Sequence, residues 1–395
     1  MKVRFVNFPK LMPGTHWRTV PDVVIVGAGP VGLFMGVLLL QRGHQVRILE
    51  RRSNRSNSSR AIGIHPPALA ELARAGVADP LVTAGIHIRR GVAYSRRRRV
   101  AELAFDGDAA FPFILAVPQM ITEEVLELAV KELDADAVVR GADVQEIDAT
   151  GSTLRVRADS PSGSLQVGAR LVIAADGAHS TIRRRYLPGV PARSYPDCYI
   201  MGDFPDDTGH ASDAVLYLEP EGIVESFPLP GGVRRWVVRL GAPHRNPTPV
   251  GLAGLITART GEVLDIAGNS MLSAFEVRSR LTQRMVHGRV VFLGDAAHEI
   301  SPIGGQGMNL GWLDAAALAP IMDASLRGAN VGRDVVNFEK LRRKAALRAS
   351  RQAGLNMALG RPLPPPAMSA RNMLFASALA VPAISELVER RFTMR

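Results

Sequence analysis

The residues best suited to chemistry begin with a glycine-rich turn and an acid that follows it. Gly27, Gly29 and Gly32 form a G-x-G-x-x-G pattern, and Glu50 stands 21 residues after Gly29. Glycines at this spacing permit a tight turn and the close approach of a pyrophosphate, which a helix N-terminus attracts. Glu50 would accept hydrogen bonds from a ribose. The pattern therefore predicts a dinucleotide site, and it leaves NAD and FAD open.

A second segment, "GDAAHEISPIGGQGMNLG", begins at Gly294 and favours a flavin. Asp295 would follow a buried strand over 289–295, and a helix is expected to start near Met308–Asn309. The glycines between them would let a flat ring lie on the backbone. The helix N-terminus would stabilise the negative charge of a reduced flavin, and Asp295 would bind the hydroxyls of a sugar-alcohol chain.

A third segment, "LVIAADGAHSTIRR", covers residues 171–184. It predicts a buried strand that ends at Asp176-Gly177, followed by Ser180 and Arg183. Taken alone, it fits an ordinary strand with an Asp-Gly turn as well as it fits a ligand site.

The elements that must position these residues start with a βαβ unit. A strand over 22–26, a helix over 31–42 and a strand over 45–50 predict a parallel sheet. Prolines at 66 and 67 start a second helix. A third covers 121–133, with Thr122 as its cap. A strand pair is expected over 138–149 and 153–158.

From about residue 190 to 280 the chain changes to short strands separated by proline and glycine, with Pro230-Gly231-Gly232 as a hairpin turn. The predicted fold is α/β: a Rossmann-like, doubly wound FAD-binding domain with an inserted antiparallel β-sheet substrate domain and C-terminal helices. The predicted boundaries are an extension over 1–20, the FAD-binding domain over 21–190 and 285–330, the substrate sheet over 191–284 with part of 90–115, and a helical region over 331–395.

Composition narrows the function classes. The 395 residues carry a net charge of +11, but the arginines are dispersed, which favours a solvated surface over nucleic-acid binding. Cys198 is the single cysteine, so an intramolecular disulfide and a thiolate metal cluster are excluded, and no metal site is predicted. No signal peptide pattern is evident, and the longest apolar stretches are shorter than the roughly 20 residues that span a bilayer. A cytoplasmic location is expected.

Together the three segments resemble the class A, p-hydroxybenzoate hydroxylase-like FAD monooxygenases over about residues 22–325. "SSRAIGIHPPALAELARAGV" and "PQMITEEVLELAV" resemble two further segments of that family, while Ala175 stands where the family often has glycine. The resemblance implies that FAD is bound by Gly27, Gly29, Pro30, Gly32, Glu50, Arg51, Arg60, Gln119, Asp176, Arg183, Gly294, Asp295, Pro302, Gly305, Gly307, Met308 and Asn309.

The resemblance also implies an activity. NADH or NADPH would reduce the FAD, O2 would add to give a C4a-hydroperoxide, and one oxygen would pass to a phenolic, quinone-like or polyketide-type ring, as in secondary metabolism. No catalytic residue is identified. His298 is a candidate proton relay, and its alternative role is structural. His65, Tyr94, Tyr217 and Trp236 are candidates for the substrate pocket, with the protein core as the alternative.

Other functions stay open at this point. A reductase or desaturase of the geranylgeranyl-reductase kind shares much of the FAD domain, and a redox sensor would bind flavin without turnover. The Trp-x-Trp-x-Ile-Pro signature of many flavin-dependent halogenases is missing, because tryptophan occurs at 17, 236 and 312. The tail from Arg371 to Arg395 would either touch a membrane surface or close the substrate domain, and the protein would be a monomer or a homodimer.

Overall fold

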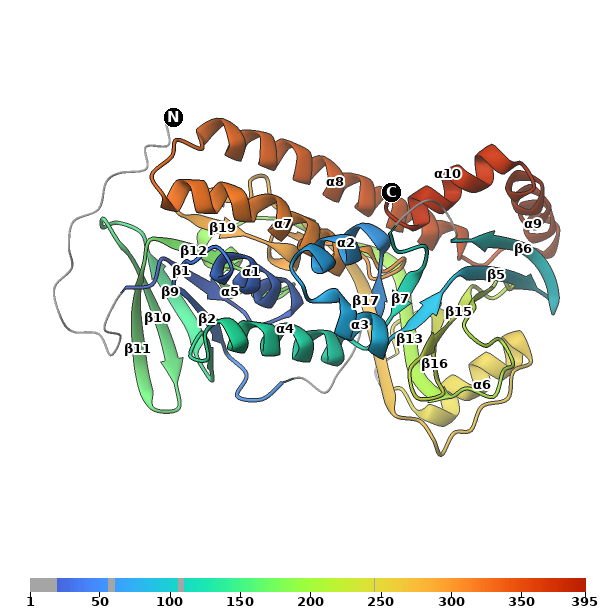
Figure 1. The fold of residues 1–395 in the computed structure, drawn as a ribbon. Helices are drawn as coiled ribbons and strands as arrows, with labels where there is room; N and C mark the ends of the chain where they lie inside the picture. Colours follow the sequence, from blue (N-terminus) through green and yellow to red (C-terminus); the bar gives the residue numbers. More distant parts are fainter. Residues whose placement is uncertain (1–19, 56–60, 106–109, 245) are drawn as a thin grey trace.

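The computed structural model describes residues 20–55, 61–105, 110–244 and 246–395. The predicted extension over 1–20 therefore lies outside the described residues except for Val20, and Arg60 lies outside them as well. Figure 1 shows an elongated molecule with a sheet near each end and helices between them.

A mostly parallel sheet forms the first half. Its six strands are ordered β18 (Val286–His287), β19 (Val290–Phe292), β12 (Leu171–Ala174), β1 (Val23–Val26), β2 (Val46–Glu50) and β8 (Val138–Arg140). All neighbours pair in parallel except β18 with β19. Every residue of β1, β12 and β19 is buried, as expected for parallel strands covered on both faces. The predicted βαβ unit is confirmed, with α1 (Pro30–Leu40) between β1 and β2.

The helices of this half lie together beside the sheet. Helix α1 packs against α4 (Gln119–Leu133) and α7 (Gln306–Leu326), and α2 (Pro66–Arg74) packs against α7. The prolines at 66 and 67 start α2 as predicted. The predicted start of α4 is wrong. The helix begins at Gln119 after Pro118, and Thr122 lies inside it without capping it, because the fixed backbone of Pro118 already directs the chain into the helix.

The strand pair predicted over 138–149 and 153–158 is divided in the structure. Strand β8 joins the edge of the parallel sheet, whereas β9 (Asp143–Asp148) pairs with β10 (Leu154–Ser160). A third strand, β11 (Gly163–Ala169), completes a separate antiparallel sheet. Apolar residues of these three strands pack into the same hydrophobic core as the parallel sheet.

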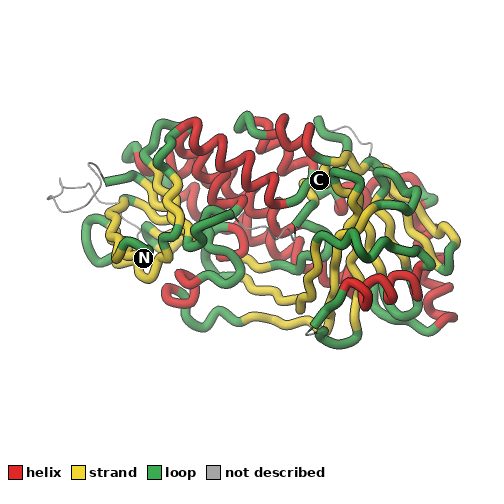
Figure 2. The backbone as a smooth tube through the Cα atoms, turned by 90° about the horizontal axis from the view of Figure 1, so that it is seen from below, coloured by secondary structure: helices red, strands yellow, loops and turns green. Residues whose placement is uncertain are grey.

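An eight-stranded sheet forms the second half. Its order is β20 (His298–Glu299), β17 (Met271–Leu281), β13 (Ala192–Pro205), β16 (Val233–Leu240), β15 (Val224–Leu229), β14 (Ala214–Tyr217), β5 (Arg90–Ser95) and β6 (Arg98–Ala104). Only β14 and β5 pair in parallel. The hairpin predicted at Pro230-Gly231-Gly232 joins β15 to β16. Helix α6 (Pro249–Thr260) packs against one face of this sheet. Figure 2 shows the long strands that connect the two halves.

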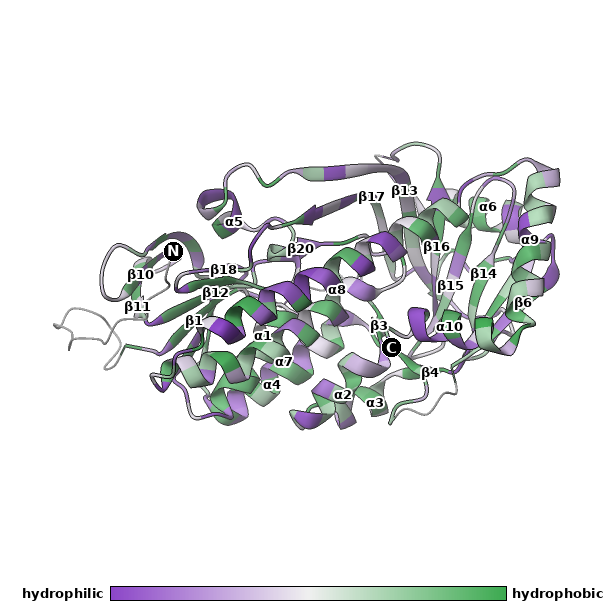
Figure 3. Cartoon of the chain, turned by 90° about the horizontal axis from the view of Figure 1, so that it is seen from above, coloured by the Kyte–Doolittle hydropathy of each residue, from purple (hydrophilic) through white to green (hydrophobic). Residues whose placement is uncertain are grey.

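Three smaller strands lie between the two halves, and the C-terminal helices run from the first half to the outer end of the second (Figure 1). Strands β3 (Gly63–Ile64), β7 (Ile114–Ala116) and β4 (Ile86–Ile88) form a short sheet. Helix α8 (Gly332–Leu359) packs along α7 and mixes hydrophilic with hydrophobic residues (Figure 3). Helices α9 (Pro365–Leu379) and α10 (Pro382–Phe392) follow, and α9 packs against β6.

The described helices differ in length and in apolar content. None of them is, by itself, both long enough and apolar enough to span a bilayer. Helices α9 and α10 reach the required length and composition only as a pair, and they are bent by 101° where they meet.

Candidate cofactor and substrate site

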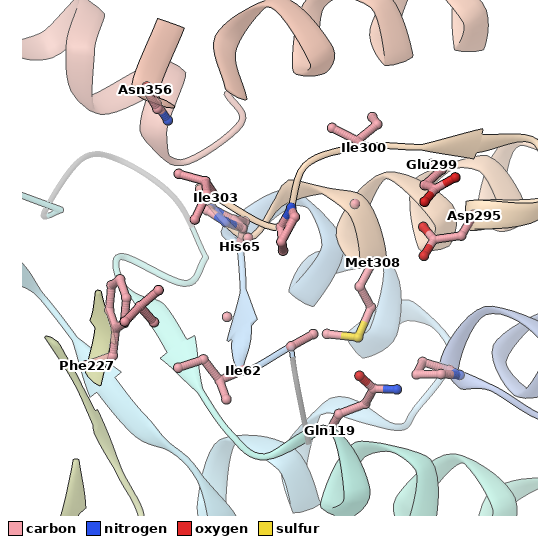
Figure 4. A pocket seen from close by; sticks show the side chains of 18 of the residues that line it. Ile62, His65, Gln119, Phe227, Asp295, Glu299, Ile300, Ile303, Met308 and Asn356 are labelled. Atoms are coloured by element: carbon pink, nitrogen blue, oxygen red, sulfur yellow. The ribbon is translucent and has the colours of Figure 1, made fainter. Parts of the chain in front are cut away.

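One large cavity lies where the two halves meet. Its volume is about 970 Å³, and its lining combines the ends of the parallel strands, the cavity face of the eight-stranded sheet and the C-terminal helices. Figure 4 shows side chains from these separate elements converging on it. Of the sequence-predicted site residues, those that line the cavity are Gly27, Gly29, Pro30, Glu50, Arg51, His65, Gln119, Asp176, Gly294, Asp295, Pro302, Gly305, Gly307 and Met308.

The three motif segments meet because their strands are neighbours. Strands β19, β12 and β1 are adjacent and parallel, so their carboxyl ends lie at one edge of the sheet. Gly27 follows β1, Asp176 follows β12, and Asp295 follows β19. Ligands of open α/β sheets bind at this edge.

The glycines of the first motif have different tasks. Gly27 has φ +105°, and a Cβ there would lie 2.5 Å from the carbonyl oxygen of Ala175. A Cβ on Gly32 would collide with the carbonyl of Gly27. A Cβ on Gly29 would meet no atom within 4 Å, and Gly29 lines the cavity. Gly27 and Gly32 are therefore required by packing, while Gly29 leaves open space beside the N-terminus of α1.

The N-terminus of helix α1 is suited to binding an anion. Helix α1 begins at Pro30 after Gly29, without a side-chain cap and without an acid in its first turn. An uncapped N-terminus leaves backbone N–H groups and a partial positive charge, both of which favour phosphate.

Glu50 faces the cavity at the end of β2 and is 4% exposed. Its Oε2 accepts a hydrogen bond from the Ala28 backbone N–H at 2.8 Å, and its Oε1 accepts from the N–H and side chain of Arg52. Burial opposes ionisation, but the hydrogen bonds from Arg52 and Ala28 outweigh it and lower the pKa of Glu50. The carboxylate is ionised at neutral pH and has lone pairs left for ribose hydroxyls.

Of the two predicted site residues in the Asp-Gly segment, Asp176 lies at the cavity and Arg183 lies behind it. Asp176 lines the cavity, and its buried Oδ1 has no hydrogen-bond partner among the described residues. Burial raises the pKa of Asp176. Arg183 does not line the cavity. Its guanidinium donates to the carbonyls of Asp295 and Ala296 at 2.9 and 3.0 Å, and burial lowers the pKa of this arginine. Arg183 thus positions the neighbouring segment.

Asp295 and Glu299 bring two carboxylates together at the cavity (Figure 4). The Asp295 side chain is exposed to the cavity, although protein surrounds it on its other sides. The surrounding protein desolvates its carboxylate and raises the pKa of Asp295 to about 6. No described residue donates a hydrogen bond to this side chain. Glu299, by contrast, pairs with Arg280 at 3.2 Å.

The loop from Pro302 to Gly307 presents backbone to the cavity, as expected for a flat ring. Gly305 has φ +65° and caps the N-terminus of α7 without a side-chain hydrogen bond. Asn309 is fully buried and does not line the cavity. Its amide donates to the carbonyls of Gly63 and Gly305 and accepts from the N–H of His65. Asn309 therefore fixes the loop to β3 and α2.

The two histidines differ. His65 lies at the cavity beside Ile303 (Figure 4), and burial lowers the pKa of His65 to about 4, so the ring is neutral at pH 7. His298 is fully buried, does not line the cavity, and pairs with Asp314, which also pairs with Arg342. Burial opposes protonation, but Asp314 outweighs it and raises the pKa of His298. This position fits the structural alternative better than a proton relay at the substrate.

The three aromatic pocket candidates lie on the opposite face of the sheet. Tyr94 and Tyr217 stack at 5.9 Å, Tyr217 stacks on Trp236 at the same distance, and none lines the cavity. Tyr217 and Trp236 pack in the core that includes residues of α6. They have no place in the pocket because side chains alternate between faces along a strand, and the neighbouring positions face the cavity.

The residues that face the cavity from the eight-stranded sheet and from the C-terminal helices were not predicted from the sequence. On the sheet they include Met201, Leu216, Glu225, Phe227, Arg235 and Val237. From the C-terminal helices they include Phe375, Leu379, Val388 and Phe392. The sequences of β15 and β16, VESFPL and VRRWVVRL, do not alternate regularly between apolar and polar residues, so only the fold shows which face meets the cavity. The C-terminal helices carried no signal for this role.

Comparison with known proteins identifies the family of the chain. Residues 21–353 match the family described as "FAD binding domain". The chain belongs to this FAD-binding family. The resemblance to the class A flavin monooxygenases stated above is confirmed by the relatives. The 6-methylpretetramide 4-monooxygenase of Streptomyces rimosus is 30% identical over 323 residues, which cover 78% of this chain and 56% of that protein. The para-nitrophenol 4-monooxygenase of Pseudomonas sp. strain WBC-3 is 26% identical over 84% of each chain.

Solved structures share the fold. The p-nitrophenol 4-monooxygenase PnpA of Pseudomonas putida DLL-E4 superposes with a TM-score of 0.86 at 24% identity, covering 94% of this chain and 97% of that one. The OxyS anhydrotetracycline hydroxylase of Streptomyces rimosus gives 0.77 at 27% identity, covering 95% and 76%. The predicted fold class is thereby confirmed. The chain spans only 56% and 62% of the length of two of its curated relatives.

The described residues fit FAD. The open space at Gly29 and the uncapped α1 suit a pyrophosphate, and Glu50 suits a ribose. The unpartnered oxygen of Asp176 and the carboxylate of Asp295 are acceptors for cofactor hydroxyls. Among the described residues no group of histidine, cysteine and acidic side chains could hold a metal ion.

Proposed function

We propose that this chain is an FAD-dependent monooxygenase that uses NADH or NADPH and O2 to hydroxylate an aromatic small molecule. The observation that supports this most is the continuity of the cavity. The same space extends from the polar cradle at Gly29 and Glu50 to the largely apolar face of the eight-stranded sheet. A flavin in the cradle and an aromatic ring on the sheet would therefore share one continuous cavity.

The bound flavin, once reduced, would supply the oxygen-activating chemistry. The N-terminus of α1 would hold its pyrophosphate, Glu50 its ribose and Asp295 its sugar-alcohol chain. The N-terminus of α7 would stabilise negative charge on the ring, because its cap makes no side-chain hydrogen bond. The protein's part is to hold the two rings together and to exclude water.

The apolar end of the cavity supports an aromatic substrate. Met201, Phe227 and Val237 face it from the sheet, and Phe375 and Phe392 face it from α9 and α10. Relatives of the chain are named for acting on 6-methylpretetramide and on para-nitrophenol. One relative is named as a probable NADH-specific resorcinol 4-hydroxylase, so both nicotinamide cofactors belong in the test.

The domain assignment follows from the same proposal. Residues 21–190 and 285–330 would bind FAD, and residues 191–284 with β5 and β6 would hold the substrate. Residues 331–395 would close the cavity from the side of α9 and α10.

The test is a flavin absorbance experiment. The purified protein is supplied with FAD, and its spectrum near 450 nm is followed under anaerobic conditions after NADH or NADPH, with and without a panel of phenols and quinones. Reduction that an aromatic compound accelerates, followed by a hydroxylated product in air, is expected. Reduction without hydroxylation of any ring would favour a reductase. Bound flavin that neither nucleotide reduces would favour a redox sensor.

A further inference from the structure

Two of the carboxyl groups that line the cavity have no partner. This absence of a partner, like the rest of the comparison, concerns the described part of the chain, where every other acid at the cavity accepts a hydrogen bond or forms an ion pair, for example Glu299 with Arg280 and Glu276 with Arg278. Asp295, at the cofactor end, and Glu225, on the sheet, have neither. Asp295 is explained by the flavin. Glu225 lies on the substrate sheet, and the cofactor cradle does not account for it.

Glu225 is the polar member of an otherwise apolar row. Strand pairing sets Met201 opposite Val237, Val237 opposite Glu225, and Glu225 opposite Leu216. The row continues through Ala93 to Ala101, and all six residues line the cavity. Met201 and Val237 share a hydrophobic cluster with Ile303 of the glycine loop. Since neighbouring strands are about 4.8 Å apart, Glu225 lies one strand beyond the residue that packs under this loop.

Without a ligand, the position of Glu225 is energetically unfavourable. It is 9% exposed, and burial without a compensating hydrogen bond raises the pKa of Glu225 to about 7. Arg235, two residues before Val237 on β16, is not the partner of Glu225. Its guanidinium donates to both carboxylate oxygens of Asp203 at 2.7 Å. The acid is thus a free acceptor above an apolar floor.

We propose that Glu225 recognises the substrate by accepting a hydrogen bond from a phenolic hydroxyl or an aromatic amine. The site would accordingly select uncharged aromatic rings that carry such a donor and reject aromatic carboxylates. This inference rests on the proposed function, because it assigns the ring to the sheet end of the cavity. A carboxyl acceptor would hold a donor group strongly, whereas a carboxylate ligand would face an acid across a cavity of low polarity.

Calorimetric titration with two probes of matched size tests the proposal. FAD-loaded protein is titrated at pH 7.5 with 1-naphthol and with 1-naphthoic acid. The wild type is expected to bind 1-naphthol at least about tenfold more tightly than 1-naphthoate. Glu225→Leu removes the acceptor and should weaken 1-naphthol binding by about tenfold. Glu225→Gln keeps an acceptor oxygen and removes the charge, so it should retain 1-naphthol and bind 1-naphthoate more tightly than the wild type.

The control is Glu146→Gln, which removes an exposed carboxylate that pairs with Arg157 on β10, away from the cavity. It should leave both affinities unchanged. Wild-type protein that binds neither probe, or binds both equally, overturns the proposal, as does an unchanged preference in Glu225→Leu. If Glu225→Leu does not fold, the gain in 1-naphthoate affinity by Glu225→Gln decides alone. FAD content and bleaching by NAD(P)H, measured on the same samples, report separately on the proposed function.

Discussion

Arg183 donates a hydrogen bond to the main-chain carbonyl of Asp295 at 2.9 Å, and so ties the segment after β12 to the segment after β19. It makes a second bond to the carbonyl of Ala296. The guanidinium thereby acts on the cavity from behind, through the backbone of a residue that lines it.

Replacing Arg183 with Gln should therefore cost stability and loosen FAD together. Buried carbonyls lose a charged donor, which costs about 2–3 kcal/mol in the free energy of unfolding. Urea unfolding and FAD titration would measure the two effects. Arg184→Gln is the matched control, because Arg184 is an exposed neighbour of Arg183 on helix α5 (Thr181–Tyr186). Equal effects of the two substitutions would contradict this role for Arg183.

Asp295→Asn should separate stability from cofactor binding. The pKa of Asp295 in the folded protein, about 6, is above its usual value of 3.8, so this group lowers stability as pH rises through that interval. The FAD-free variant should be as stable as the wild type near pH 4 and more stable at pH 8. Its FAD affinity should nevertheless fall about tenfold, because a charged acceptor for the sugar-alcohol chain is lost. Unchanged FAD affinity would contradict the placement of the sugar-alcohol chain of FAD beside Asp295.

Gly29→Ala should mainly weaken FAD binding, whereas Gly27→Ala should mainly lower the stability of the protein. The added methyl group of Gly29→Ala meets no atom, so unfolding should change little while FAD affinity drops sharply. Gly27→Ala forces a side chain into a left-handed backbone against Ala175, so the protein itself should be destabilised by more than about 1 kcal/mol. Thermal unfolding of FAD-free protein and FAD titration distinguish them, and a large loss of stability in Gly29→Ala would argue against open space there.

Glu225→Gln should show the cost of the unpartnered acid. The folded-state pKa of Glu225 is about 7 against a usual 4.5, so the wild type loses stability as pH rises from 4.5 to 7. The stability gained by the variant should grow between pH 5 and pH 8 by on the order of 1–3 kcal/mol. Urea unfolding at the two pH values is the measurement. A pH-independent difference would mean that Glu225 has a partner.

His298→Gln should reveal a structural ion pair. Because Asp314 raises the pKa of His298, the stabilisation is complete below the usual pKa of 6.5 and is lost as pH rises through the higher folded-state value. The variant should lose about 3 kcal/mol near pH 6 and less at alkaline pH. Urea unfolding at pH 6 and pH 9 would show this. A variant with wild-type stability at pH 6 and impaired hydroxylation would instead support the proton relay.

The sequence was sufficient for the features that depend on local pattern. The βαβ unit and the strands that end at Asp176 and Asp295 are short apolar runs with a turn or acid at the end, and parallel strands bring such ends together. Local pattern was not sufficient to predict on which face of the sheet Tyr217 and Trp236 lie. Which face of β14 and β16 meets the cavity depends on the pairing of β14 with β5, more than 100 residues away, and no local pattern encodes that pairing.

Arg183 and Asn309 illustrate a second limit. Their motifs predicted contacts with the flavin, but their side chains bond to backbone behind the cavity wall. A motif fixes where a residue lies along the chain. It does not distinguish a side chain that contacts a ligand from one that holds the contacting segment.

The alternation along β15 and β16 has a consequence for how proteins with this fold diversify. Glu225, Phe227 and Val237 face the cavity, while Val224, Trp236 and Val238 pack into the core beneath α6. Residues that face the cavity and residues that hold the sheet together are thus interleaved on opposite sides of the same strands. Mutations can change the cavity-facing residues while the core residues stay the same. A scaffold organised in this way can acquire new substrates in single steps without first losing its fold.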